Sequence, residues 1–263
     1  MKYITRKTMI YKTDVEYGDY TLNHVQGCSH GCKYPCYAFM MAKRFGKIKT
    51  YEEWTEPALV VNAIEIIKKE IPILKDKIEI LHLCFTTDPF MCGYQEVCDM
   101  SYDILKLLNE NGIKCSVLTK GLLPEKLSNL SKKNEYGITL VSLNENFRKE
   151  MEPQSADFER RIACLEDLHN KGFKTWVSIE PYPTPYIVKC FFLIFQGIFS
   201  YISQMNEPRR WVFLCIWYEN SWFGVYEVKR LSFPLYMALC IPLLLWQLTS
   251  RVYQDLLTSR CAS

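Results

Sequence analysis

Short β-rich runs alternate with stretches of helical periodicity between residues 20 and 181, and this alternation limits the possible folds more than any other feature. Strands are predicted at 20–26, 78–85, 113–119, 137–143 and 173–180, and helices at 37–44, 57–70, 96–111 and 157–171 and from Pro124 onward. Strands separated by helices pair in parallel. We therefore predict an α/β fold, either a TIM-like barrel or a doubly wound sheet, and both place ligands at the carboxyl ends of the strands.

Polar residues follow every predicted strand. They are Cys28, Cys32 and Cys36 after the first strand, Thr86, Thr87 and Asp88 after the second, Lys120 after the third, Asn144 after the fourth and Glu180 at the end of the fifth. Because parallel strands end at a common rim, we expect these side chains to converge there. Asp, Asn and Thr are also ordinary helix caps and turn formers, so one of them alone would indicate only a turn.

Three cysteines lie within nine residues, in the segment GCSHGCKYPC, and this crowding indicates metal ligation. A closed zinc site needs four ligands, so a zinc site here would need His24 or His30 as its fourth. Three thiolates on a four-iron cluster instead leave one iron open to an outside ligand, as a reactive site requires. The spacing therefore favours an iron-sulfur cluster over zinc, and free thiols are the third alternative.

The composition is that of a globular protein. The chain has 263 residues, of which 49% are hydrophobic and 23% charged, so it can form one domain, or one domain with an appendage. Its twelve cysteines are too sparse for a small disulfide scaffold, which predicts a reducing, cytoplasmic setting. The first residues contain no continuous apolar run, so we expect no secretory signal.

The net charge of +3 comes from the carboxyl-terminal part of the chain. Residues 1–186 carry 25 basic and 25 acidic side chains, whereas residues 187–263 carry seven basic and four acidic ones. The first part therefore lacks the overall basic surface that binding to nucleic acid normally needs. The strongest local group of cations, Lys43, Arg44, Lys47 and Lys49, is either a solvated helix face or a site for a polyanion.

The composition changes after Tyr186, which places a boundary between residues 1–186 and an aromatic-rich segment, 187–263. Four of the six tryptophans lie in this tail, and the alternation of strands and helices stops. Residues 231–249 carry no charge and reach the length of a membrane span, although two prolines interrupt them. We favour a buried or irregular segment over a membrane anchor.

Five ordered blocks between residues 18 and 186 resemble the radical S-adenosylmethionine (SAM) superfamily, in its spore photoproduct lyase-like (DNA repair photolyase-like) branch. The blocks are TLNHVQGCSHGCKYPCYA, FTTDPF, SVLTKG, VSLNENFRKEMEP and ERRIACLEDLHNKGFKTWVSIEPYPTP. The resemblance implies a partial (β/α) TIM-like radical SAM barrel. It also implies that Cys28, Cys32 and Cys36 bind three irons of a [4Fe-4S] cluster while S-adenosylmethionine chelates the fourth.

The implied reaction is reductive cleavage of S-adenosylmethionine to a 5′-deoxyadenosyl radical, which abstracts hydrogen from a substrate that the sequence does not identify. The resemblance to spore photoproduct lyase suggests an enzyme of the lyase type. Such an enzyme needs a reductant such as flavodoxin or ferredoxin. A nucleotide, a peptide or a small metabolite remains open as substrate. The alternatives are a Cys/His metal-binding module without catalysis, and an inactive product whose carboxyl terminus comes from a disrupted reading frame.

The resemblance also assigns cofactor-binding positions. Tyr37 matches an aromatic residue that lies beside the adenine, and the alternative is a core tyrosine at a helix start. Thr86, Thr87 and Asp88 stand where many members carry Gly-Gly-Glu for the methionine ammonium. Lys120 is expected to pair with the cofactor carboxylate, and a surface lysine is the alternative.

Three further positions complete the expected site. Ser142 and Glu180 are expected to reach the ribose or adenine. Cys84 lies one residue out of register with the hydrogen-donating cysteine of spore photoproduct lyase, and its alternative is a buried core thiol. The chain departs from the family in two ways: Pro35 lengthens the usual C-x3-C-x2-C loop to C-x3-C-x3-C, and no barrel continuation is recognised after Tyr186.

Overall fold

The computed structural model describes residues 1–14, 17–34, 36–179, 217–218 and 221–222. The chain divides into two compact units, 1–197 and 198–263. In the second unit, β10 (Trp217–Tyr218) and β11 (Ser221–Trp222) form an antiparallel pair. The expected boundary at residue 186 and the uncharged run at 231–249 lie outside the described residues.

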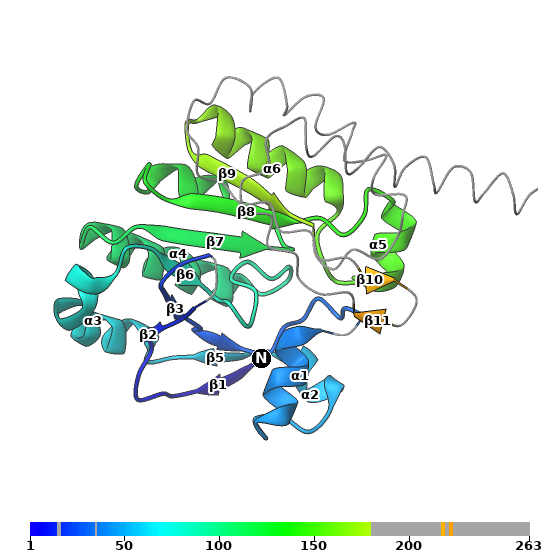
Figure 1. Ribbon diagram of the computed structural model, residues 1–263, viewed down its shortest axis with the longest axis horizontal. Coiled ribbons are helices and arrows are strands. Elements are labelled where there is room, and N and C mark those ends of the chain that lie inside the picture. The colour runs from blue at the N-terminus through cyan, green and yellow to red at the C-terminus, as the bar shows by residue number, and fades with distance from the viewer. Residues whose placement is uncertain (15–16, 35, 180–216, 219–220, 223–263) are drawn as a thin grey trace, which may run out of the picture. The chain divides into compact units, whose positions relative to one another are not determined.

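A six-stranded sheet forms the centre of the first unit (Figure 1). Its strands, in their order across the sheet, are β2 (Tyr11–Lys12), β3 (Tyr20–Leu22), β6 (Leu81–Leu83), β7 (Cys115–Thr119), β8 (Glu135–Thr139) and β9 (Lys174–Ser178). Strand β2 is antiparallel to β3, and all other neighbours are parallel. Parallel strands that neighbour one another in chain order are typical of a partial TIM-like barrel, so the predicted fold class is confirmed.

Amphipathic helices connect the parallel strands. These helices are α3 (Ala63–Leu74) before β6, α4 (Gln95–Glu110) between β6 and β7, and α5 (Glu145–Met151) and α6 (Phe158–Asn170) between β8 and β9. The buried residues of α4 are Val97, Ser101, Ile104, Leu105 and Leu108, whose spacing of three and four places them on one face. Strands β6 and β8 are buried along their whole length, because both of their faces are covered.

A second, smaller sheet lies beside the cysteine loop. It has the order β1 (Lys2–Ile4), β5 (Ala58–Val60) and β4 (Val25–Gln26). After the cysteines come α1 (Tyr37–Arg44) and α2 (Tyr51–Thr55), whose Trp54 packs with Ala42 and Ile48 in a separate small core. Among the described residues, no helix has the length and apolarity needed to cross a membrane.

Several of the predicted elements are wrong in detail. The predicted strand at 137–143 is β8 at Glu135–Thr139, and the one at 78–85 is limited to β6 at Leu81–Leu83. Residues 58–60, predicted as helix, form the buried strand β5, because a short apolar run suits either element and pairing with β1 and β4 decides it. The predicted first strand is divided at residues 23–24 between β3 and β4, which belong to different sheets. The segment after Pro124, predicted as an α-helix, is the 3-10 helix η2 (Glu125–Asn129). Another 3-10 helix, η1 (Lys75–Lys77), follows α3.

Candidate cluster and cofactor site

The cysteine loop starts with a glycine that no other residue can replace without strain. Gly27 has a φ of +86°, and a Cβ atom there would lie 2.6 Å from the carbonyl oxygen of Trp54. The next amide, that of Cys28, donates to the same carbonyl at 2.9 Å. The loop is therefore fixed to α2 at its first cysteine.

The three loop thiols share one electrostatic environment. Burial raises the pKa of Cys28, and the neighbouring Asp88, Cys32 and Cys36 raise it further. The Tyr51 hydroxyl donates to the carbonyl oxygen of Cys32 at 2.5 Å. The pKa of Tyr51 is raised by burial and then by all three thiols. In the described part of the chain, no three His, Cys, Asp or Glu side chains are grouped to hold a single metal ion.

Both histidines that would complete a zinc site are already hydrogen-bonded within the protein. His30 Nε2 lies 2.8 Å from Asp88 Oδ2, and both side chains are buried. His24 Nε2 lies 3.0 Å from the Ser101 hydroxyl, and its Nδ1 lies 3.2 Å from Cys84 Sγ. Burial lowers the pKa of His24 to about 4, so its ring is neutral near pH 7. The donor set therefore fits three thiolates with an open fourth position better than Cys3His.

Asp88 connects the cysteine loop to the ends of two strands. Its Oδ1 accepts from the Phe90 amide at 2.8 Å and from the Thr119 hydroxyl at 2.6 Å. Its Oδ2 accepts from the Lys120 amide at 2.7 Å and contacts His30 Nε2 at 2.8 Å. Burial alone would raise the pKa of Asp88, but His30 and these hydrogen bonds outweigh it and lower the pKa. The carboxylate is thus ionised and already has four protein partners.

Lys120 belongs to a buried ionic network that sequence reasoning missed. Its Nζ lies 2.6 Å from Glu152 Oε1 and also contacts the Tyr34 hydroxyl, which itself donates to Glu152. Glu152 Oε2 lies 3.1 Å from Nη2 of the buried Arg161. Burial opposes the charge on Lys120, but Cys32 and Glu152 outweigh it and raise the pKa of Lys120. Lys120 is therefore a largely enclosed cation beside the cysteine loop, with 16% of its side chain exposed, and not a surface lysine.

The segment around Glu152 also holds the cysteine loop through its backbone. The Lys33 amide donates to the Met151 carbonyl at 2.8 Å, and the Gln154 amide donates to the His30 carbonyl at 3.1 Å. Glu152 lies in the block VSLNENFRKEMEP, but nothing in the spacing of that block indicates that this carboxylate is the buried one. The pairing is long-range, so only the folded structure reveals it.

The remaining predicted residues lie in varied settings. The Thr86 amide and hydroxyl both donate to Asn23 Oδ1 at 3.0 Å, and the Thr87 hydroxyl donates to the Val25 carbonyl at 3.4 Å. The Ser142 hydroxyl accepts from the Asn144 amide at 3.0 Å. Glu180 lies outside the described residues. Thr86 thus joins the end of β6 to the residue after β3, and Thr87 joins it to β4, whereas Ser142 forms a local turn.

Tyr37 is the first residue of α1, directly after Cys36, and is 51% exposed. Its ring packs edge-on against Phe85 with the centroids 5.9 Å apart. It is therefore not the core tyrosine that was the alternative, and an exposed ring beside the cysteine loop is compatible with stacking on a planar ligand.

Cys84 is buried and has a φ of +62°, which is uncommon for any residue other than glycine. Burial raises its pKa to about 12, so the thiol keeps its proton near pH 7. Its sulfur faces His24 at the end of β6, close in sequence to Thr86 and Asp88.

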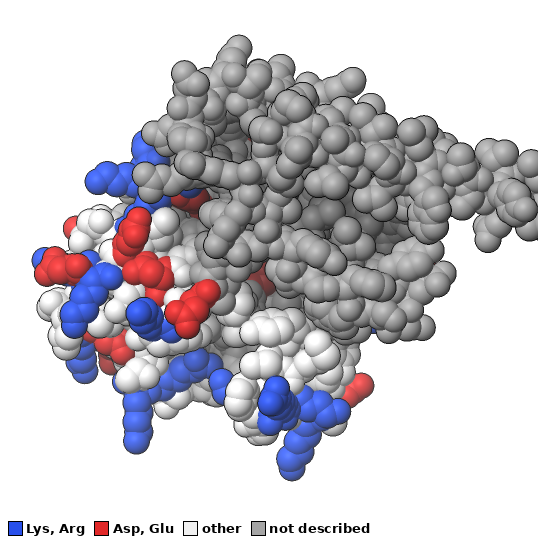
Figure 2. Space-filling view, in the orientation of Figure 1, with Lys and Arg blue, Asp and Glu red and all other residues white. Residues whose placement is uncertain are grey.

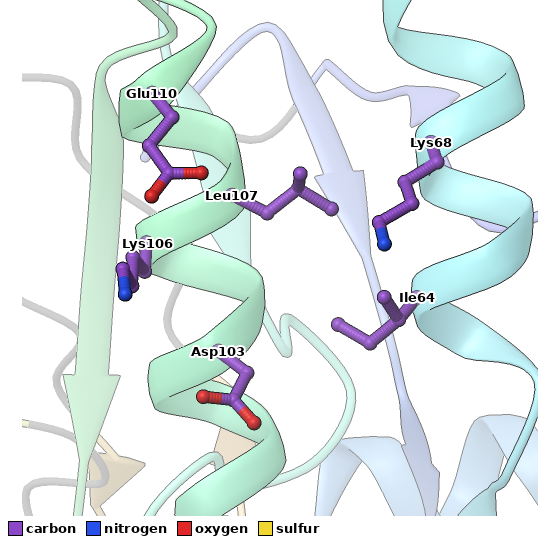
Figure 3. Close-up of a pocket in the computed structure, with 6 residues that line it drawn as sticks. All are labelled: Ile64, Lys68, Asp103, Lys106, Leu107 and Glu110. Carbon is purple, nitrogen blue, oxygen red and sulfur yellow. The ribbon is translucent and has the colours of Figure 1, made fainter.

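A cavity of about 270 Å³ lies away from this rim, between α3 and α4 (Figure 3). It is lined by Ile64, Lys68, Asp103, Lys106, Leu107 and Glu110. All six belong to the two helices and none to a strand end, so this groove is an ordinary gap between exposed helix faces.

Comparison with known proteins gives a family match and several similar structures. Residues 22–185 match the radical SAM superfamily. An uncharacterized protein from Methanocaldococcus jannaschii is 30% identical over 182 residues, which cover 68% of this chain and 66% of that protein. Spore photoproduct lyase complexed with dinucleoside spore photoproduct has a TM-score of 0.59 at 16% identity, over 78% of this chain and 58% of that one.

A variant of the same lyase with bound AdoMet and dinucleoside spore photoproduct gives the same TM-score of 0.59 at 16% identity, again over 78% of this chain and 58% of that one. At this identity the similarity concerns the fold alone, and the chain spans about two thirds of the archaeal relative and less of the lyase. The match over residues 22–185 is nevertheless most of the first unit. The chain therefore belongs to the radical SAM superfamily of enzymes.

Proposed function

We propose that Cys28, Cys32 and Cys36 hold a [4Fe-4S] cluster at which S-adenosylmethionine is cleaved reductively. When bound, the cluster and cofactor supply a 5′-deoxyadenosyl radical that takes hydrogen from a substrate. The observation that carries this proposal is a loop with three cysteines within nine residues, whose two neighbouring histidines are both hydrogen-bonded to other groups.

The buried groups around the loop suit particular roles in this reaction. We assign Lys120 to the cofactor carboxylate, because its amine is held charged near Cys32. We assign the cofactor ammonium to the hydroxyls of Thr86 and Thr87, which donate to protein oxygens and can still accept. Asp88 already has four partners, so its proposed role changes from ammonium acceptor to positioning His30 and Lys120.

Three assignments stay predictions. Tyr37 is proposed to lie beside the adenine, and Ser142 and Glu180 to approach the ribose or adenine. Cys84 is proposed as a hydrogen donor to a substrate radical, although its packing in the hydrophobic core also fits the alternative of a buried core thiol.

The substrate of the lyase is not transferred to this chain, because the chain spans 58% of that protein. Residues 1–186 carry equal numbers of acidic and basic side chains, 25 of each, and this balance does not favour a nucleic-acid duplex as the substrate. A soluble cytoplasmic setting and an external electron donor are proposed with the activity.

The test is anaerobic reconstitution of the full chain with iron and sulfide, then reduction with dithionite in the presence of S-adenosylmethionine and chromatography for 5′-deoxyadenosine. We expect cluster absorbance and product from the native chain, and neither from Cys32→Ala. Cys164→Ala is the matched control, because Cys164 is a half-buried cysteine on α6, away from the loop in sequence. This variant should retain both the cluster absorbance and the product. A protein that binds zinc and forms no cluster would overturn the proposal, and a cluster without product would show that this chain does not support turnover.

A further inference from the structure

Four exposed cations lie on the segment that continues the cysteine loop. Lys43 and Arg44 form the last turn of α1, and Lys47 and Lys49 follow it. We call these four residues the basic face. Figure 2 shows Lys and Arg side chains gathered over the region of α1 and α2. Within the described residues, no ion pair joins any of the four to a carboxylate.

Helix stability explains only half of this charge. Cations in the last turn of a helix interact favourably with its dipole, which accounts for Lys43 and Arg44. Lys47 and Lys49 lie beyond the helix end, where that interaction has faded, and residues 37–51 contain no acidic side chain. Glu52 and Glu53 lie at the edge, on α2, where Glu53 accepts from the Lys49 amide at 2.7 Å.

Exposed apolar side chains accompany the cations. Met40 is 45% exposed and Phe45 is 66% exposed. Met40 and Arg44 are four residues apart, so they share one side of α1. A surface that combines Met, an aromatic ring and Arg is typical of a protein interface, in which apolar contacts supply affinity and charges select the partner.

The position of this surface indicates which partner it suits. Cys36, one of the three proposed cluster ligands, is the residue before α1, and α1 is eight residues long. A partner on the basic face would therefore sit one short helix away from the cluster. Duplex binding generally uses more phosphate contacts than four cations provide, and the rest of residues 1–186 adds no net positive charge.

We propose that the basic face docks an acidic electron-transfer protein that reduces the cluster. The inference rests on the proposed function. In this step the reduced partner loses one electron and the cluster gains it, with no bond made or broken in the protein. Docking by charge would make this step fast at low salt and slow at high salt.

The test compares two double charge reversals in the full chain. Lys43→Glu with Lys47→Glu alters the basic face. Lys68→Glu with Lys106→Glu alters two exposed lysines of the α3–α4 groove in Figure 3 and changes the net charge equally. The probe is flavodoxin, an acidic flavoprotein. Its binding is followed by fluorescence anisotropy of the oxidised form, and the formation of 5′-deoxyadenosine is measured with photoreduced flavodoxin and, separately, with dithionite.

We expect the basic-face variant to lose about tenfold or more in flavodoxin binding and in flavodoxin-driven rate at low salt, and to keep its rate with dithionite. The groove variant should change by less than about twofold in both. Equal losses in the two variants, or an equal loss with dithionite, would overturn the docking proposal. So would tighter binding of a duplex oligonucleotide than of flavodoxin to the basic face. If dithionite yields no product from the native chain, the proposed function fails, and the anisotropy measurement still decides the docking.

Discussion

The rim of strand ends uses polar residues in two different ways. At the ends of β6 and β7, Asp88 contacts His30, Thr119 and Lys120, which are 31 to 58 residues away in sequence. After β8, Ser142 and Asn144 contact backbone amides two or three residues away. Polar residues in similar positions therefore connect distant parts of the chain in one place and form a helix start in the other. The two places differ in how far apart in the sequence the contacting residues lie, and substitutions at each place can test this difference.

The largest expected effect is that of Glu152→Gln. This change removes the charge that neutralises buried Lys120 and Arg161, and breaking a buried ion pair by removing one partner typically costs about 3–5 kcal/mol of unfolding free energy. Urea denaturation of the apoprotein measures it. The matched control is Glu56→Gln, because Glu56 pairs with Lys2 on the surface, and it should be near neutral. Similar losses in the two variants would contradict the long-range role of Glu152.

Acid should weaken the same network. The pKa of Glu152 is about 2 in the folded protein, since Lys120 and Arg161 outweigh the effect of burial, and it is 4.5 in a free side chain. Its contribution is therefore complete above about pH 4.5 and is lost as the pH falls toward 2, on the order of 3 kcal/mol in total. Urea unfolding at a series of pH values measures this loss. The Glu152→Gln variant should show a flatter profile in that window, and an unchanged profile would show that other groups cause the acid sensitivity.

Asp88→Asn should have the next largest effect. The amide keeps one acceptor oxygen but replaces the other with a donor, which faces two of the four groups that now donate to the carboxylate. The expected cost is about 2–3 kcal/mol, with a lower iron content after reconstitution because His30 is released. Asp99→Asn, at an exposed pair with Lys126, is the control and should be near neutral. A normal iron content in Asp88→Asn would exclude the positioning role.

The sequence predicts regular elements well where the pattern is long and has clear ends. Helix α1 occupies the predicted residues, and α4 and α6 differ from the prediction by one residue at each end. Gly112 and Gly172, which follow these two helices, take the left-handed conformation that is common after a helix end. Strand β5 was missed because three buried apolar residues fit a helix as well as a strand. The spacing of apolar residues describes one helix or strand at a time. It carries little information about which strands pair in a sheet.

The candidate site shows the same limit. The three cysteines could be proposed from the sequence as ligands of one cluster, because they are close together in the chain, and this assignment stays a prediction. The partners of Lys120 could not be proposed in this way, because Tyr34 and Glu152 lie 86 and 32 residues away from it. Charged residues are usually exposed, so a sequence gives no reason to bury these in particular.

The smallest effect is expected from Asn144→Ala, which removes contacts between residues that are close together in the sequence. The Asn144 side chain accepts from the amides of Asn146 and Phe147 at the start of α5, and removing such a cap costs about 1 kcal/mol. Asn144→Asp keeps the acceptor and should retain full stability in the same urea experiment. Iron content after reconstitution should stay normal in both variants, because neither amide belongs to the cysteine loop. If Asn144→Ala instead lowered the iron content as much as Asp88→Asn, the cap would be coupled to the cluster site through α5 and the Met151 carbonyl that accepts from Lys33, and the two halves of the rim would act as one.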